Sequence, residues 1–202
     1  MDLITEQTPA IALVYEPAEA IHMQQPPRDR KRDHLLDGRL MLYTGVVMAT
    51  LLTLAATGAF LLALLQRGFP VGDLLYNADF WASPPPAAAD ALASGVSAYF
   101  WTLVVGQAAV HAFLAKTSRV SILTHGVCRN TVTLVGAFTA VVISILVIFA
   151  LGGSFFGCGS MPQATSWCMP IAFALIALPL TEAAKAIARA YPSGKFSRNV
   201  LW

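Results

Sequence analysis

LMLYTGVVMATLLTLAATGAFLLALL, residues 40–65, is the stretch that decides the fold of this chain. It contains no charged side chain and no proline, and it exceeds the roughly 20 residues that a helix needs to cross the hydrocarbon core of a bilayer. The sequence therefore predicts a helix that spans a membrane, and the rest of the chain is consistent with that prediction.

The composition of the whole chain is that of a membrane protein. Of its 202 residues, 56% are hydrophobic and 12% are charged, and the mean hydropathy is +0.63, whereas soluble domains carry about 25% charged residues. The small net charge of +2 and the lack of a basic run with interleaved aromatic side chains exclude a nucleic-acid partner. The lipid bilayer is the predicted partner. Acidic residues ahead of a short apolar segment at the amino terminus predict no signal peptide.

Further apolar segments predict an all-α fold, an antiparallel bundle of four transmembrane helices at about residues 40–65, 96–114, 131–151 and 169–190. The segment 66–94 is interpreted as a long loop, because it holds glycines, acidic residues and the run Pro84-Pro85-Pro86. Small residues recur at every fourth position of two helices and predict close helix contacts, namely Gly45, Ala49, Thr53 and Thr57 in the first and Gly136, Ala140 and Ser144 in the third.

The lysines and arginines predict the orientation. Of the 13 in the chain, Arg67 alone falls between the first and second helices, and none falls between the third and fourth. All the others belong to one side of the membrane, which the positive-inside rule makes cytoplasmic. The loop 21–39, the tail 191–202 and both termini are therefore predicted to be cytoplasmic in a multi-pass membrane protein.

The chain begins with two carboxylates four positions apart, in Met1-Asp2-Leu3-Ile4-Thr5-Glu6-Gln7-Thr8-Pro9. On a helix, Asp2 and Glu6 share one face, where like charges repel unless a cation or a proton lies between them. Thr5 adds a neutral oxygen, and Pro9, which has no N–H, would leave the Thr5 carbonyl free for a hard cation. Thr8 and Pro9 also fit an ordinary helix start. The spacing alone leaves a metal site at Asp2 and Glu6 and a plain helix cap as alternatives.

The residues after this acidic pair predict a short helix. Residues 9–20 are apolar from Ala10 to Tyr15, the helix is expected to stop near Pro17, and the segment is too short to span a bilayer. Residues 1–20 are therefore interpreted as the truncated end of a membrane helix, placed ahead of the 21–39 loop.

Polar side chains occur at three other places in the apolar part of the chain. Gln107 and His111 lie four residues apart and fit either an ion path or interhelical hydrogen bonds. Cys158 and Cys168 share the uncharged loop 152–168, which permits a disulfide if the loop faces an oxidising compartment, and free cysteines are the alternative. Near the end of the fourth helix stand side chains spaced for ion pairs, namely Glu182, Lys185 and Arg189.

The first part of the chain also resembles a known family. Asp2-Leu-Ile-Thr-Glu-Gln-Thr-Pro-Ala, followed by Met23-Gln-Gln-Pro-Pro-Arg, resembles the end of the sixth membrane helix and the next cytoplasmic loop of P-type cation ATPases. Tyr15-Glu16-x-Ala18-Glu19 is more similar to the Na+,K+/H+,K+ branch than to the sarcoplasmic Ca2+ branch. The rest of the chain shows looser similarities, which place the four spanning helices as the seventh to tenth of that family. These similarities are found at Lys116-Thr117, Trp167-Cys168, Glu182-x-x-Lys185 and Pro192-Ser-Gly194.

The resemblance implies the C-terminal transmembrane part of an ATPase for Na+ or K+ in the plasma membrane. Asp2 matches the first cation-coordinating aspartate, and Glu6 stands where the family has a second aspartate. Gln107 matches a glutamine near a sodium site, so the predicted cation-binding set is Asp2, Thr5, Glu6 and Gln107. The aspartate expected three residues after Gln107 is Val110 here. The loop 66–94 departs from the Na+,K+ pump where that pump holds its β subunit, which leaves such a partner open.

The motifs that this chain lacks limit its predicted activity. It contains no Asp-Lys-Thr-Gly-Thr phosphorylation motif and no Thr-Gly-Glu actuator motif. Alone, the chain is predicted not to be an enzyme and to bind no cofactor, and ATP and Mg2+ are expected only in other domains. The expected partner is the remainder of the ATPase. The alternatives are a stand-alone non-catalytic membrane interaction protein and a nonfunctional truncated remnant.

Overall fold

The computed structural model describes residues 5, 7–17, 38–70, 72, 76, 82, 86–117, 120–159 and 164–190. All regular structure in these residues is helical, which confirms the predicted all-α class. In chain order the elements are α2 (Gln7–Ala12), η1 (Leu13–Tyr15), α3 (Gly38–Leu42), η3 (Tyr43–Met48), α4 (Ala49–Gln66), α7 (Pro86–Val105), η4 (Gly106–His111), α8 (Ala112–Leu114), α9 (Ile122–His125), α10 (Thr131–Leu146), η5 (Val147–Leu151), α11 (Gly152–Phe155) and α12 (Ala164–Ala190).

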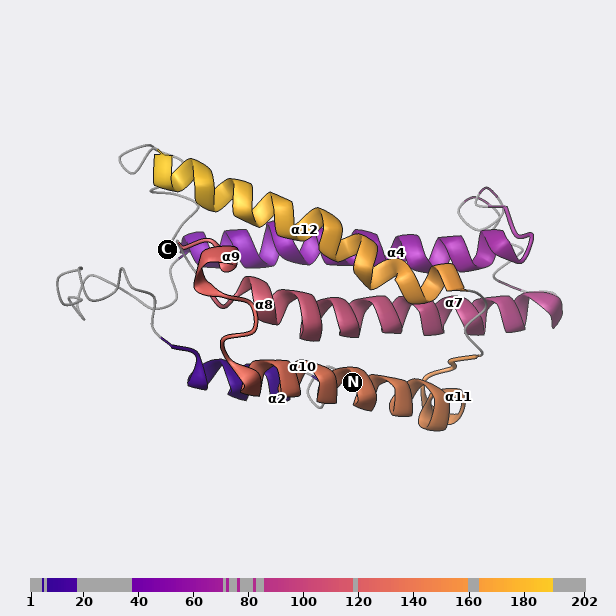
Figure 1. Ribbon diagram of the computed structural model, residues 1–202. Helices are drawn as coiled ribbons and strands as arrows, with labels where there is room; N and C mark the ends of the chain where they lie inside the picture. The colour runs from indigo at the N-terminus through magenta and orange to yellow at the C-terminus, as the bar shows by residue number, and fades with distance from the viewer. Residues whose placement is uncertain are drawn as a thin grey trace.

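Four helices are long and apolar enough to cross a membrane, and they form an antiparallel bundle (Figure 1). α7 lies in the middle of the bundle, with α4 and α12 on one side and α10 on the other. The short helix α2 lies beside the first half of α10. The spans are Tyr43–Gln66, Pro86–Leu114, Thr131–Leu151 and Ala164–Ala190.

Small side chains make the contact between α4 and α7. Ala59 and Ala63 of α4 are fully buried together with Ala98 of α7. Gly95 lies so close to α4 that a Cβ there would come within 2.8 Å of a Phe60 ring carbon. Helices in lipid have no hydrophobic drive toward each other, so close approach and dispersion contacts hold such a pair together. We call these residues the α4–α7 seam.

The second spanning helix begins earlier than the sequence predicts. α7 starts at Pro86, and its first turns contain the buried residues Ala88 and Ala91, although the prolines and Asp90 predict a loop up to residue 94. Proline is favoured in the first turn of a helix, and alanine is the strongest helix former. The last part of the predicted loop is therefore helix.

The fourth spanning helix also begins earlier, at Ala164 rather than at Met169. The ring of Trp167 packs against Trp101, with ring centroids 4.9 Å apart, and stacks on Phe149 at 5.7 Å. The Trp101 indole N–H donates a hydrogen bond to the carbonyl of Trp167 at 3.2 Å. These tertiary contacts support a first turn that the sequence pattern does not mark.

The two predicted small-residue faces differ in the structure. The face on α10 is buried along its length, at Gly136, Ala140 and Ser144, which confirms that prediction. The face on the first spanning helix is exposed within the described part of the chain, at Gly45, Ala49, Thr53 and Thr57. That helix packs instead through a neighbouring face, which comprises Leu52, Ala56, Ala59 and Ala63. The prediction for Gly45 to Thr57 is therefore wrong for contacts among the described residues.

Three of the spanning helices contain a π-helical stretch, namely η3, η4 and η5. A π-turn holds more residues than an α-turn and is rare except as a single turn inside a longer helix. η4 is the stretch that carries Gln107 and His111.

Candidate functional site

The described part of the candidate cation site begins at Thr5. This residue is helical and fully buried, whereas Asp2 and Glu6 lie outside the described residues. α2 follows, and its continuation η1 ends at Tyr15, so the helix stops before Pro17 as predicted.

α2 packs on α10 at Gly136. The Thr8 hydroxyl donates a hydrogen bond to the Gly136 carbonyl at 3.4 Å. A Cβ on Gly136 would come within 3.0 Å of the Thr8 carbonyl oxygen and 3.2 Å of the Pro9 Cα. Both are backbone atoms, which cannot rotate away as a side chain could. The glycine at position 136 therefore permits α2 to approach α10 closely, and the two helices cross at this residue.

A buried group of polar side chains surrounds Glu16, just past the end of α2. One carboxylate oxygen, Oε1, lies 3.2 Å from His125 Nε2. The other, Oε2, accepts hydrogen bonds from Asn130 Nδ2 at 2.9 Å and Thr133 Oγ1 at 3.3 Å, and lies 3.5 Å from Lys116 Nζ. We call Glu16 and these four partners the Glu16 cluster.

The Glu16 cluster joins segments that lie far apart in the sequence. Glu16 follows η1, Lys116 follows α8, and His125 ends α9. The exposed fraction of the side chain is 8% for Glu16 and 0% for Lys116. Lys116 also donates a hydrogen bond to the carbonyl of Val127 at 3.0 Å and lies 5.1 Å from the ring centroid of Phe113. The ammonium group is thus held in place independently of the carboxylate.

The charge of Glu16 follows from these contacts. Burial raises the pKa of its carboxyl group, but the Asn130 hydrogen bond, the Lys116 charge and the His125 hydrogen bond outweigh burial. The pKa therefore lies below its usual value of 4.5, and Glu16 is an anion near neutral pH. The protein tolerates a buried ion pair of this kind because additional donors form hydrogen bonds with the remaining lone pairs of the carboxylate.

Asn130 contacts two helices at once. Its Oδ1 accepts hydrogen bonds from the N–H groups of Val132 at 3.0 Å and Thr133 at 3.4 Å, which caps the first turn of α10. Its Nδ2 donates to the carbonyl of Ala12, the last residue of α2, at 3.1 Å, in addition to Glu16. The Asn130 amide therefore caps the first turn of α10 and also forms a hydrogen bond with the last carbonyl group of α2.

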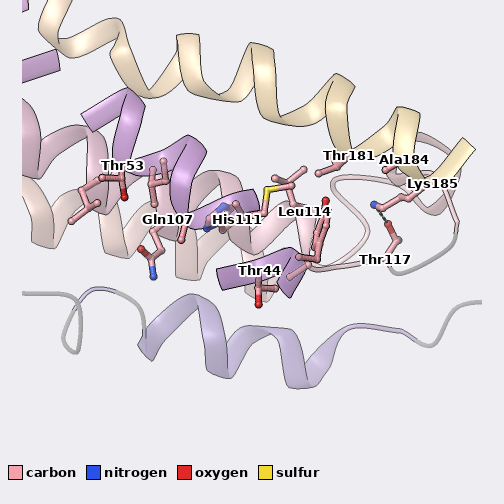
Figure 2. Close-up of a pocket in the computed structure, with 15 residues that line it drawn as sticks. Thr44, Thr53, Gln107, His111, Leu114, Thr117, Thr181, Ala184 and Lys185 are labelled. Carbon is pink, nitrogen blue, oxygen red and sulfur yellow. Dashed lines mark hydrogen bonds between the residues drawn. The ribbon is translucent and has the colours of Figure 1, made fainter. Parts of the chain in front are cut away.

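A cavity of about 390 Å³ lies on the other side of the bundle, lined by residues of η3, α4, η4 and α12 (Figure 2). Gln107 and Thr53 lie at one end of this cavity. Lys185 and Thr117 lie at the opposite end, where Lys185 Nζ donates a hydrogen bond to Thr117 Oγ1 at 2.8 Å. Gln107, which belongs to the predicted cation set, is half-buried here.

His111 lines the same cavity between these two ends (Figure 2). Its Nε2 atom is buried and has no hydrogen-bond partner among the described residues. Its ring meets the Phe173 ring edge-on, with centroids 5.7 Å apart. Gln107 and His111 thus line one cavity, which is consistent with the shared helix face that their spacing predicts.

The ion pair predicted near the end of the fourth helix is confirmed. Lys185 Nζ lies 3.3 Å from Glu182 Oε1. The same carboxylate oxygen accepts a hydrogen bond from the backbone N–H of Ile122 at 3.2 Å. The pair therefore connects α12 to α9.

The permitted disulfide between Cys158 and Cys168 is not present, since both are free cysteines. Ser97 of α7 donates a hydrogen bond to the Gly159 carbonyl at 2.7 Å, which holds this segment against the bundle and buries Cys158. Burial also raises the pKa of the Cys158 thiol, although its hydrogen bond with Ser97 acts in the opposite direction. Cys168, by contrast, is exposed on α12.

Among the residues that the structure describes, no group of three or more His, Cys, Asp or Glu side chains could hold a metal ion. The predicted metal ligands Asp2 and Glu6 are not among those residues. Their role therefore stays a prediction.

Sequence reasoning missed the Glu16 cluster. One signal was present, because Asn130 directly precedes an apolar helical run and is a preferred N-cap residue. The partners of Glu16 lie more than a hundred positions away in the sequence for His125, Asn130 and Thr133. A single sequence carries no local pattern for such a pairing.

Known proteins resemble this chain along its whole length. The family described as "Cation transporting ATPase, C-terminus" matches residues 1–187. Potassium-transporting ATPase alpha chain 2 of Oryctolagus cuniculus is 26% identical over 222 residues, and its counterpart in Homo sapiens is 26% identical over 216. The sodium/potassium-transporting ATPase subunit alpha-4 of Homo sapiens is 26% identical over 218 residues. Each alignment covers 100% of this chain but only 20% or 21% of the relative, so the chain spans about a fifth of the length of these relatives.

Proposed function

Because this chain belongs to the cation-transporting P-type ATPases as their C-terminal membrane domain, we propose that it supplies part of the binding site for a transported monovalent cation. The observation that carries the proposal is the match of the whole chain to alpha chains named for potassium and for sodium and potassium transport. The transported ion, Na+ or K+, is the ligand of the site.

The proposed ligands come from two segments. Asp2 and Glu6 supply carboxylates, and Thr5 between them supplies a neutral oxygen. Such oxygen ligands suit hard cations, and a cation relieves the repulsion between two carboxylates on one helix face. The full burial of Thr5 supports a site removed from water. Gln107 supplies an amide oxygen from η4, at the edge of the cavity.

Chemistry and binding are divided between this chain and the rest of the ATPase. The phosphorylated aspartate, ATP and Mg2+ belong to other domains, so this chain binds and releases the ion and catalyses nothing by itself. The proposed setting is the plasma membrane, with both termini on the cytoplasmic side, as the distribution of lysine and arginine favours. The proposed partners are the bilayer and the remaining membrane helices and cytoplasmic domains of the ATPase. A β-type subunit is not included among them.

The test is equilibrium binding of radioactive sodium and rubidium to membranes that contain this chain with the rest of its ATPase. Asp2→Asn and Glu6→Gln are each expected to raise the half-saturating cation concentration about tenfold or more, since an interaction with a charged group contributes about 1.5–3 kcal/mol. Glu6→Asp, which removes one methylene, is expected to change the ratio of sodium to rubidium affinity.

The matched control is Gln7→Ala, which changes an exposed residue of the same segment. Its half-saturating concentrations should equal those of the wild type. Unchanged binding by both Asp2→Asn and Glu6→Gln would overturn the proposal.

A stand-alone membrane interaction protein is the second candidate function. The observation that favours it is the exposed small-residue face on the first spanning helix, which leaves room for another helix. On this hypothesis, Ala49→Leu releases a copurified membrane protein, while Asp2→Asn and Glu6→Gln leave that protein's activity unchanged. Loss of cation binding in the two acidic variants would instead favour the ATPase.

A further inference from the structure

Among the described helices, α2 packs against α10. The position of the segment that carries Thr5 therefore depends on the contacts between these two helices.

Two contacts fix α2 against α10. Near its start, backbone atoms of Thr8 and Pro9 lie so close to Gly136 that a Cβ there would meet them at 3.0–3.2 Å, a tighter contact than most Cβ atoms make. At its end, Asn130 holds the Ala12 carbonyl, and Glu16 enters the Glu16 cluster. Because α2 is held at both ends, these contacts define its position along α10 and its rotation about its own axis. Thr5 lies one helical turn before Thr8, so the same contacts define the position of Thr5.

We propose that Glu16 and Lys116 are positioning residues for cation binding, which hold α2, and with it Thr5, at one position along α10 and at one rotation about the helix axis. This inference rests on the proposed function. Neither residue touches the ion. They act through the backbone between Thr5 and Glu16, which is anchored to the bundle by their ion pair.

The charge of Glu16 is essential to this role, as its surroundings show. Its Oε2 meets donors only, namely the Lys116 ammonium, the Asn130 amide nitrogen and the Thr133 hydroxyl. Lys116 also donates a hydrogen bond to the Val127 carbonyl, which keeps its ammonium group from moving with a displaced Glu16 carboxylate. Glu16→Gln keeps the size of the side chain but places an NH2 group, or a weaker neutral oxygen, among these donors. The variant therefore disturbs the position of α2 without a change of volume.

The experiment is cation binding by the same membrane-embedded ATPase, measured as two quantities: the half-saturating concentration and the maximal number of cations bound. Glu16→Gln is expected to raise the half-saturating concentration about fivefold or more, which is within the range for residues that act on a site indirectly. Maximal binding should stay unchanged, because every ligand is still present. The double variant Glu16→Gln/Lys116→Met also lacks the ion pair that anchors α2, so its half-saturating concentration should stay as high as that of Glu16→Gln. Wild-type affinity in the double variant would overturn the inference.

The control is Thr165→Val. It breaks a side-chain hydrogen bond between α4 and α12, donated by Gln66 Nε2 to Thr165 Oγ1 at 2.6 Å, and neither helix carries a member of the Glu16 cluster. Its half-saturating concentration should equal that of the wild type. An equal loss in the Thr165→Val and Glu16→Gln variants would overturn the positioning role, because any broken polar contact would then have the same effect.

Other outcomes separate this inference from the proposed function. Wild-type affinity in Glu16→Gln overturns the inference alone, provided that Asp2→Asn still loses affinity. Lower maximal binding with an unchanged half-saturating concentration also overturns it, because that result indicates a loss of folded protein only. If the wild type binds no cation, both the proposed function and the inference fail.

A milder variant keeps the test decisive if Glu16→Gln does not accumulate in the membrane. Thr133→Val keeps the shape of a fully buried side chain and removes one donor, the hydroxyl at 3.3 Å from Glu16 Oε2. The half-saturating concentration should rise about twofold, the lower end of the range for such indirect effects. An unchanged value in folded Thr133→Val would overturn the inference.

Discussion

The α4–α7 seam and the Glu16 cluster hold helices together by different means. At the seam, Ala59, Ala63 and Ala98 bring two long helices into contact without any polar group. At the Glu16 cluster, a carboxylate, an ammonium group and an amide hold a helix of one to two turns. The comparison teaches that small side chains suffice for helices with many contacts, whereas a short segment needs directional bonds.

The two regions also define different quantities. Small apolar side chains set how close two helices come, but a row of alanines fits nearly as well after a small slide along the axis. Hydrogen bonds lose strength steeply when their angle or length changes, so they define the level and the rotation of a segment. The bundle therefore uses polar groups where the position of a neighbouring side chain matters.

The largest expected effect is at the Glu16 cluster. Lys116→Met leaves the Glu16 carboxylate buried without its counter-charge and should destabilise the folded bundle by about 3–5 kcal/mol. The measurement is the free energy of unfolding in mixed detergent micelles, followed by circular dichroism. The double variant with Glu16→Gln is the control and should recover most of the loss. A cost below about 1 kcal/mol, which is typical of an exposed ion pair, would show that the pair does not anchor α2.

A bulky side chain at the α4–α7 seam should have a smaller effect. Ala59 is fully buried between the helices, so Ala59→Leu must push α4 away from α7, at a cost of about 1–3 kcal/mol. The same unfolding measurement gives the value. Ala49→Leu, on the exposed side of α4, is the control and should change the free energy of unfolding by no more than about 0.5 kcal/mol. If Ala59→Leu costs more than Lys116→Met, the order of the two regions is reversed.

A single added methyl group tests the place where α2 meets α10. Gly136→Ala brings a Cβ within 3.0 Å of the Thr8 carbonyl oxygen and should cost about 1 kcal/mol, at the lower end of the range for overpacking. Gly45→Ala is the control, since nothing lies within 4 Å of a Cβ there, and should be neutral or slightly stabilising because alanine favours the helix. Equal stability of the two variants would show that α2 does not pack tightly on α10.

The smallest expected effect is the pH dependence of the Glu16 contribution. The pKa of the Glu16 carboxyl group lies below its unfolded value of 4.5, so its stabilisation is complete above pH 4.5 and is lost as the pH falls through the folded pKa. The difference in unfolding free energy between wild type and Glu16→Gln should therefore be constant from about pH 7 to pH 5.5 and shrink below pH 4.5. A difference that disappears between pH 7 and pH 6 would assign the effect to another group.

The sequence predicts the spanning helices well and their contacts less well. Hydropathy marks a span such as 131–151 because lipid demands an uninterrupted apolar run of sufficient length. It does not show which side of such a helix faces a neighbour, because an apolar helix carries no periodic pattern. For this reason the small-residue patterns at Gly136 and Gly45 look alike in the sequence, although only Gly136 packs against another described helix.

The candidate site likewise has one part that the sequence predicts and another part that it does not. The acidic pair and Gln107 could be proposed from residue types, since charged and polar side chains are rare at membrane depth. The Glu16 cluster depends on a turn of the chain between α8 and α10 that brings Lys116 and Asn130 to Glu16. Only the folded arrangement shows that contact. The free thiols of Cys158 and Cys168 are a similar case, because a shared loop does not determine the direction in which each side chain points.

The double role of Asn130 has a mechanical consequence. Its amide holds the last carbonyl of α2 through Nδ2 and the first N–H groups of α10 through Oδ1. A pulling force applied to α2 is therefore transmitted to the first turn of α10 rather than to the loop that precedes it. Under tension from the amino-terminal end in a single-molecule experiment, α2 and this first turn are expected to rupture in one step, and Asn130→Ala should divide that step into two weaker ones.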